Sequence, residues 1–149
     1  MNPANTHSFF FVVRLALLAG LLLAAATARA QDVVIVANKT LSVPTLTAGQ
    51  LRDIFIGTRT RLADGSHIVP VALKGGPVQE VFLRKHVGDN PDEYRARWRK
   101  AVFTGQGTMI KEFVSESTLL EYIAATPGAI GYVSRVDDRT DVKVLTISR

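Results

Sequence analysis

The chain has 149 residues, a formal net charge of +5 and no cysteine. This length fits one domain behind an export signal, and the absence of cysteine excludes disulfides, thiol catalysis and Cys-based metal sites. The excess of cations is modest, so an anionic partner is permitted but not required.

The first 30 residues have the layout of a secretory signal peptide. Arg14, the single cation of residues 1–26, precedes an apolar run over 15–26, and Ala28-Arg29-Ala30 meets the small-residue rule for cleavage. The apolar run is shorter than the roughly 20 residues that span a membrane, although an uncleaved N-terminal anchor stays open as the alternative. We therefore expect a periplasmic or secreted protein, cleaved near Ala30, which meets the membrane only during export and has one domain over 31–149.

Strand and helix signals alternate from the start of this domain. The β-branched run 33–37 predicts a strand that is buried on both faces, which requires helices on both sides of the sheet. Thr47 is a suitable N-cap for the next helix, which Gly57 is placed to end. The apolar face expected to cover the sheet consists of Leu51, Ile54 and Phe55.

A second strand and a glycine-rich turn follow. The run 68–73 predicts a strand, and Pro70 indicates that part of it lies at an edge or a bulge. Gly75 and Gly76 then turn the chain, and Pro77 suits the first turn of a helix. The expected buried residues of that helix are Val78, Val81 and Phe82.

Two more helices and two strands complete the pattern. A helix from Pro91 is expected to bury Tyr94, Trp98, Ala101 and Val102. A further helix is expected to be capped by Ser117, to bury Leu119, Tyr122 and Ile123, and to stop at Pro127-Gly128. The runs 129–133 and 142–147 predict the last strands. Alternating strands and helices are typical of a layered α/β domain.

Residues 31–149 offer no arrangement that favours catalysis or metal binding. His67 and His86 lack a second histidine or a carboxylate at ligand spacing, and no nucleophile elbow or phosphate loop is present. We therefore expect no enzyme, no metal site and no cofactor. A basic run accompanies the aromatic stripe of the helix from Pro91, and its helical spacing indicates a solvated face rather than a nucleic-acid site. Its members are Arg95, Arg97, Arg99 and Lys100.

The best candidate for a binding site is the turn between the second strand and its helix. A helix N-terminus presents N–H groups to an anion, and Lys74 adds positive charge. Ordinary turn chemistry explains the same glycines, so both interpretations stay open. The candidate ligand-binding residues are Lys74, Gly75, Gly76, Val78 and Gln79.

Several segments taken together resemble the phosphate-type periplasmic solute-binding proteins of ABC transporters. They are residues 51–57 (LRDIFIG), Pro70-Val71, Phe82 and residues 126–133 (TPGAIGYV). The resemblance implies an α/β fold, namely a single three-layer lobe of the type II periplasmic-binding-protein-like fold with a central mixed sheet flanked by helices. It also implies a phosphate-type substrate-binding function, with an ABC permease as a possible partner.

The candidate turn departs from that family's pattern. Members of the family hold phosphate with an Arg and a following Gly-Ser-Gly-Thr segment, whereas this chain has Lys74 and then Pro77, Val78, Gln79 and Glu80. A point charge replaces the bidentate guanidinium group and two hydroxyl donors are absent, which leaves the backbone N–H groups. One hypothesis is therefore a protein that binds or senses a small anion such as phosphate. The alternative is a ligand-free interaction protein that binds a partner or forms a homodimer.

Overall fold

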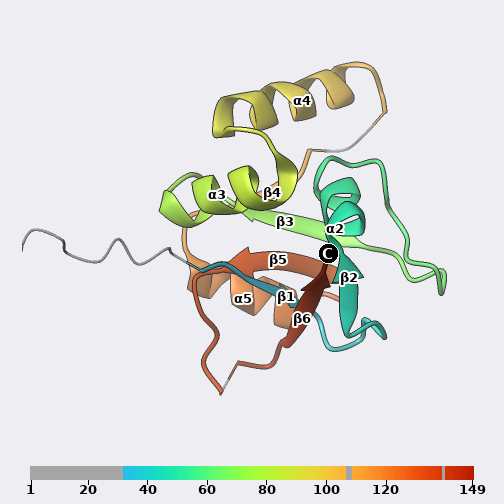
Figure 1. Cartoon of the computed structure of the whole chain (residues 1–149), viewed down its shortest axis with the longest axis vertical. Helices are drawn as coiled ribbons and strands as arrows, with labels where there is room; N and C mark the ends of the chain where they lie inside the picture. Colours follow the sequence, from blue (N-terminus) through green and yellow to red (C-terminus); the bar gives the residue numbers. More distant parts are fainter. Residues whose placement is uncertain (1–31, 107–108, 139) are drawn as a thin grey trace, which may run out of the picture. The chain divides into compact units, whose positions relative to one another are not determined.

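A mixed sheet organises the part of the chain that the computed structural model describes, which is residues 32–106, 109–138 and 140–149. In this part six strands pair in the order β2-β6-β1-β5-β3-β4 (Figure 1). The strands are β1 (Val34–Ala37), β2 (Thr45–Thr47), β3 (Val69–Leu73), β4 (Lys111–Phe113), β5 (Ala129–Val133) and β6 (Lys143–Ser148). β1 runs antiparallel to β5 and β6, and the other pairs are parallel. The predicted export signal and its cleavage site lie outside the described residues.

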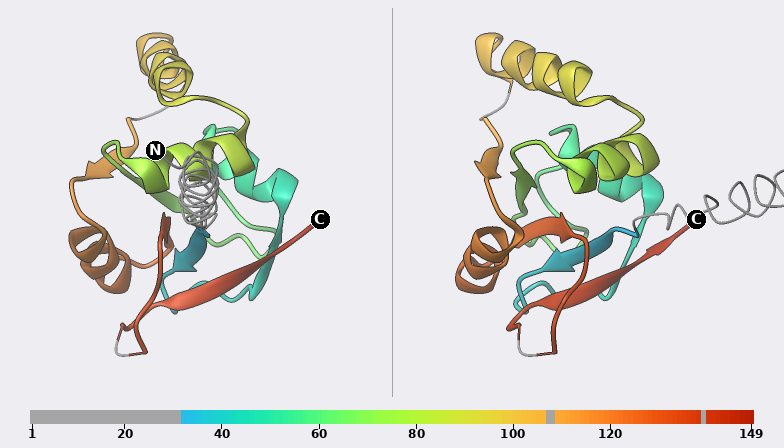
Figure 2. Two further views of the ribbon diagram at one scale, coloured as in Figure 1. Left: turned by 60° about the vertical axis from the view of Figure 1, so that its left-hand side comes forward. Right: turned by 90° about the vertical axis from the view of Figure 1, so that its left-hand side faces the viewer.

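Helices flank both faces of this sheet. α2 (Ala48–Phe55) and α3 (Pro77–Phe82) lie on one face, and α5 (Glu116–Ala125) lies on the other (Figure 2). α3 continues into a π-helical turn, η2 (Leu83–Val87), and α4 (Pro91–Phe103) lies at the periphery of the domain. The expected α/β lobe with a central mixed sheet flanked by helices is confirmed. Among the described helices, none is both long and apolar enough to cross a bilayer.

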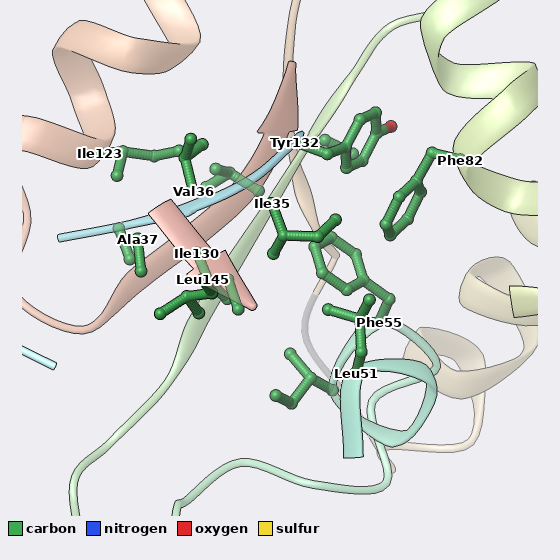
Figure 3. Close-up of a cluster of buried hydrophobic side chains, with 14 of the residues drawn as sticks. Ile35, Val36, Ala37, Leu51, Phe55, Phe82, Ile123, Ile130, Tyr132 and Leu145 are labelled. Carbon is green, nitrogen blue, oxygen red and sulfur yellow. The ribbon is translucent and has the colours of Figure 1, made fainter. Parts of the chain in front are cut away.

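The core differs in character on the two faces of the sheet. On the side of α2 and α3, Tyr132 stacks on Phe82 with ring centroids 3.8 Å apart, and Phe55 lies edge-on to Phe82 at 4.7 Å (Figure 3). On the side of α5, an added Cβ at Gly131 would lie 2.8 Å from Cδ1 of Ile123. Helix α5 therefore packs directly against the backbone of β5, where only glycine leaves room.

The predicted starts of α2, α3 and α4 and the predicted end of α2 are confirmed. The Thr47 hydroxyl accepts a hydrogen bond from the Gln50 N–H at 3.1 Å, which forms one half of a capping box. Gly57 follows the C-cap of α2 and has a φ of +82°. Pro77 and Pro91 occupy the first positions of α3 and α4, as expected for residues that need no N–H partner.

Two expectations about the later helices are wrong. Ser115, and not Ser117, caps α5, and its hydroxyl accepts a hydrogen bond from the Thr118 N–H at 3.3 Å. The Glu116 carboxylate binds the Ser134 N–H at 2.7 Å, which ties the first residue of the helix to the end of β5. Val102, which was expected to be buried, is 41% exposed, and the helix that carries it lies at the periphery of the domain (Figure 1).

Pro70 lies where one neighbouring strand has not yet begun. It pairs with Ile130 of β5, whereas β4 pairs only with residues 71–73. The prediction that part of this strand lies at an edge is therefore confirmed, because the missing N–H of a proline disrupts no ladder there. Strands β2 and β4 and the turn η2 were not predicted.

Candidate functional site

The predicted binding turn lies at the carboxyl edge of the sheet. β3 ends at Leu73, and Gly75 and Gly76 then have φ values of +87° and +90°, a region that L side chains rarely adopt. An added Cβ at either glycine would meet nothing within 4 Å, so the glycines serve the backbone turn rather than a close contact. The turn leads directly into α3, as predicted.

Two backbone N–H groups at the start of α3 have no hydrogen-bond partner among the described residues. The first helical bond runs from the Glu80 N–H to the Gly76 carbonyl at 3.1 Å. The N–H groups of Val78 and Gln79 donate to no acceptor among the described residues. The Lys74 N–H is already used, because it donates to the Phe113 carbonyl at 2.8 Å. The turn therefore offers two amide donors in addition to the exposed Lys74 side chain.

The side chain of Gln79 points into the domain and not toward a ligand. It is 2% exposed, and its Nε2 donates to the Leu73 carbonyl at 2.6 Å. The Leu73 N–H in turn donates to the Tyr132 hydroxyl at 3.2 Å, and burial raises the pKa of Tyr132 above its ordinary value. Val78 is 6% exposed and belongs to the core. Val78 and Gln79 are thus positioned to contribute backbone groups alone.

Carboxylates lie at both helix starts on this edge. Glu80 is exposed in the first turn of α3, and Glu116 opens α5. The start of α5 is also capped by Ser115, whose side chain accepts a hydrogen bond from one of the free N–H groups of the first turn. Negative charge at a helix N-terminus stabilises the helix but repels an incoming anion. The turn after β3 is therefore the more open of the two helix starts.

The two histidines that the sequence singled out lie apart. His67 is exposed, and the half-buried His86 ring lies against Phe82 at a tilt of 35°, with ring centroids 5.5 Å apart. Burial lowers the pKa of His86, and the charge of Lys85 lowers it further. The described residues contain no group of three His, Asp or Glu side chains that could hold a metal ion.

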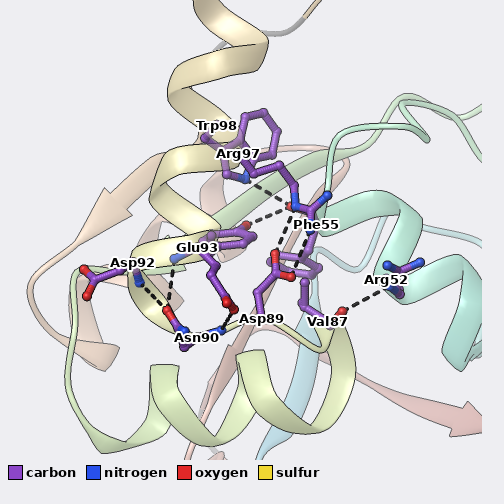
Figure 4. A network of polar contacts seen from close by, with 10 residues as sticks. Arg52, Phe55, Val87, Asp89, Asn90, Asp92, Glu93, Arg97 and Trp98 are labelled. Atoms are coloured by element: carbon purple, nitrogen blue, oxygen red, sulfur yellow. Dashed lines mark hydrogen bonds and ion pairs between the residues drawn. The ribbon is translucent and has the colours of Figure 1, made fainter.

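Helix α4 is held to the body by two hydrogen bonds to one carbonyl. The Tyr94 hydroxyl and the Trp98 Nε1–H donate to the Phe55 carbonyl at 2.9 and 3.2 Å (Figure 4). Arg97 forms two hydrogen bonds of 2.9 Å with Asp89, which precedes the helix. These bonds fix which side of α4 faces the end of α2.

A groove that the sequence did not reveal separates α4 from the adjoining end of β3 and β4. Its volume is about 460 Å³. The residues that line it, which we call the α4 groove, are Lys74, Tyr94, Arg95, Trp98, Arg99, Met109, Ile110 and Glu112. The cations of α4 are exposed, as predicted, yet two of them share this groove with Lys74 of the predicted binding turn. The only signal in the sequence was the spacing of Arg95 and Arg99, one helical turn apart.

Comparison with known proteins relates this fold to phosphate-transport receptors. No family model matches the sequence, and no curated protein matches it at a significant level. An ABC-type phosphate transport receptor from Vibrio cholerae superposes with a TM-score of 0.52 at 18% identity, over 77% of this chain and 45% of its own. A protein from Clostridium perfringens, classed as a phosphate ABC transporter substrate-binding protein and solved with bound phosphate, superposes with a TM-score of 0.59 at 21% identity, over 77% and 44%.

PstS from Borrelia burgdorferi superposes with a TM-score of 0.57 at 13% identity, over 77% of this chain and 46% of its own. The chain therefore spans less than half the length of each of these proteins. At such low identity the likeness shows a shared fold, and the fold is that of one part of a phosphate-transport receptor.

Proposed function

We propose that this chain is an exported, single-lobe protein of the phosphate-receptor type that binds a small anion at the turn Lys74–Gln79. The observation that supports it is the open start of α3, where the N–H groups of Val78 and Gln79 have no acceptor among the described residues. The exposed Lys74 ammonium group adds a positive charge to the same turn. Backbone N–H groups at a helix start, together with a cation, are a recurring arrangement for oxyanions.

The binding proposed here is weak and sensitive to salt. Lysine offers a point charge where a guanidinium group would form two parallel hydrogen bonds, and the Glu80 carboxylate opposes the anion. Exposed charges are largely screened beyond about 8 Å at physiological ionic strength. The affinity for phosphate or sulfate should therefore decline steeply as salt is added.

Calorimetric titration of residues 31–149 with phosphate and with sulfate at low salt tests this proposal. This segment forms one compact unit of the structure. Saturable heat that is lost in Lys74→Ala and kept in Lys100→Ala supports binding at the turn, because both variants remove one exposed cation. Absence of saturable heat with both anions would reject it.

Two further variants test the chemistry of the turn. Lys74→Arg should tighten binding, because a guanidinium group can bind two oxygens of one anion. Glu80→Gln should also tighten it by removing a repelling charge. If both leave the affinity of a binding chain unchanged, the anion lies elsewhere.

An interaction protein is the second candidate, and exposed apolar side chains favour it. Phe103 is 94% exposed, Met109 67% and Val102 41%, and all three lie at or just beyond the end of α4. Where such side chains form one contiguous patch, they mark a surface that binds another molecule. The partner proposed is a second copy of the chain or an ABC permease. Sedimentation analysis should then detect a concentration-dependent dimer that Phe103→Ser weakens, whereas a monomer at all concentrations would exclude the homodimer.

A further inference from the structure

The α4 groove has the size and lining of a small-molecule site. Its volume of about 460 Å³ lies within the range of roughly 300–1,000 Å³ that is typical of ligand sites. All of its lining residues belong to the described part of the chain, and they come from α4 and from the segments around the ends of β3 and β4. The groove is open to solvent, so a ligand can enter without a change in the fold.

Positive charge is concentrated on the rim of the groove. Arg95 and Arg99 are four residues apart on α4 and therefore lie on the same side of the helix, and Lys74 faces the groove from the end of β3. Arg95 forms a hydrogen bond of 2.7 Å with Asp92, whose side chain is 91% exposed. Such a surface pair stabilises little, so the Arg95 guanidinium group can exchange Asp92 for a ligand at small cost.

The rest of the lining is apolar apart from a single carboxylate. Trp98 and Ile110 are core residues and are each 7% exposed, whereas Met109 is 67% exposed. Glu112 contributes the carboxylate. A ligand that fills the groove would cover the Met109 side chain, which water now surrounds.

This combination discriminates between classes of anion. Inorganic phosphate is small and fully polar, so it would leave the apolar lining uncovered, and its double charge would be repelled by Glu112. A carboxylate joined to an apolar body would place its single charge among Lys74, Arg95 and Arg99. Its body would then displace water from Trp98, Met109 and Ile110, which is favourable by the hydrophobic effect.

We infer that the α4 groove binds an organic monocarboxylate with an apolar body, held by the cationic rim and packed against Trp98. This site is separate from the backbone anion site of the turn, although the two share Lys74. The inference needs no phosphate binding at the turn, and either site can exist without the other.

Trp98 makes the test direct, because it is the only tryptophan of the chain and it lines the groove. The probe is octanoate, which does not absorb at the wavelengths that excite tryptophan. It is added to residues 31–149 while the emission of Trp98 is followed, with the uncharged 1-octanol and inorganic phosphate in parallel titrations. We expect a saturable change of emission with octanoate and an affinity for 1-octanol weaker by about tenfold or more, since charged hydrogen bonds contribute strongly in a partly dry site.

Matched variants on α4 locate the binding. Arg99→Ala removes a lining cation and should weaken octanoate binding by about tenfold, the loss expected for one charge-assisted hydrogen bond. Lys100→Ala removes an exposed cation of the same helix that does not line the groove, and it should leave the affinity unchanged. Far-UV circular dichroism checks that both variants remain folded.

Several results would overturn the inference. They are no saturable response to octanoate, equal affinities for octanoate and 1-octanol, and equal losses in Arg99→Ala and Lys100→Ala. Phosphate binding that survives in Arg99→Ala, together with no octanoate response, would reject the groove site and retain the turn. Octanoate binding without phosphate binding would support the groove site and reject anion binding at the turn.

Discussion

Replacing Gly57 by alanine should displace Trp98 and weaken the attachment of α4. Gly57 has a φ of +82°, and an added Cβ would lie 2.8 Å from Cη2 of Trp98 and 3.3 Å from its Cζ3. A non-glycine residue in the left-handed region costs roughly 1–2 kcal/mol. Overpacking against a buried side chain costs a further 1–3 kcal/mol or so. The free energy of unfolding should therefore fall by about 2–4 kcal/mol, once the stiffening of the unfolded chain by alanine is subtracted.

Gly65→Ala is the matched control for this prediction. Gly65 has nearly the same φ, +86°, but an added Cβ would meet nothing within 4 Å. Its substitution should cost only the backbone strain of roughly 1–2 kcal/mol, reduced in the same way by the stiffening of the unfolded chain. Urea unfolding followed by far-UV circular dichroism measures both variants, and the Trp98 emission should shift to longer wavelength in Gly57→Ala alone. Equal losses of stability with unchanged emission would refute the proposed contact between Gly57 and Trp98.

Three further outcomes follow from buried groups. Gln79→Leu removes the hydrogen bond to the Leu73 carbonyl and should lower the free energy of unfolding by about 1–2 kcal/mol in urea melts, and an unchanged midpoint would contradict this role. Gly131→Ala places a Cβ 2.8 Å from an α5 side chain and should cost about 1–3 kcal/mol, so a stabilised variant would contradict the tight packing. The pKa of His86 lies below its ordinary value of 6.5, because burial and then Lys85 disfavour its charged form. Below pH 6.5 the unfolded chain thus binds the proton more readily, and stability should fall as the pH falls through the folded pKa. His86→Gln should flatten this dependence in melts between pH 5 and 7, and an identical slope would exclude His86 as its source.

Local chemistry was sufficient to predict the elements with strong signals. Thr47, Pro77 and Pro91 mark helix starts through caps and fixed φ angles, which depend on neighbours in the sequence. β4 was missed because Lys111-Glu112-Phe113 is short and polar and forms a strand only through its pairing with β3. The start of α5 was misplaced by two residues because two serines compete as its cap. The hydrogen bond from the Ser134 N–H to the Glu116 carboxylate, between residues distant in sequence, favours Ser115 as the cap.

The candidate site was predicted in part, because local sequence signals define the turn but not the contacts between residues distant in sequence. The position of Lys74 and the glycine turn follows from sequence, because a strand, two glycines and a proline define where the chain reverses. The burial of the Gln79 side chain could not be predicted, since glutamine is usually exposed. Here its Nε2 donates a hydrogen bond to the Leu73 carbonyl inside the domain. The α4 groove was missed because Lys74 and Arg99 are distant in sequence and line one groove only in the folded domain.

The position of β1 has a consequence for the order in which the domain can assemble. This strand is the first of the described strands, yet it lies between β5 and β6, with Val34 opposite Val133 and Ile35 opposite Leu145. Contacts between such distant residues require closure of long loops, which slows folding. A chain ending before β6 would leave one edge of β1 unpaired and open to association with other chains. Because β6 pairs with both β1 and β2, its addition inserts an interior strand and does not extend an edge of the sheet.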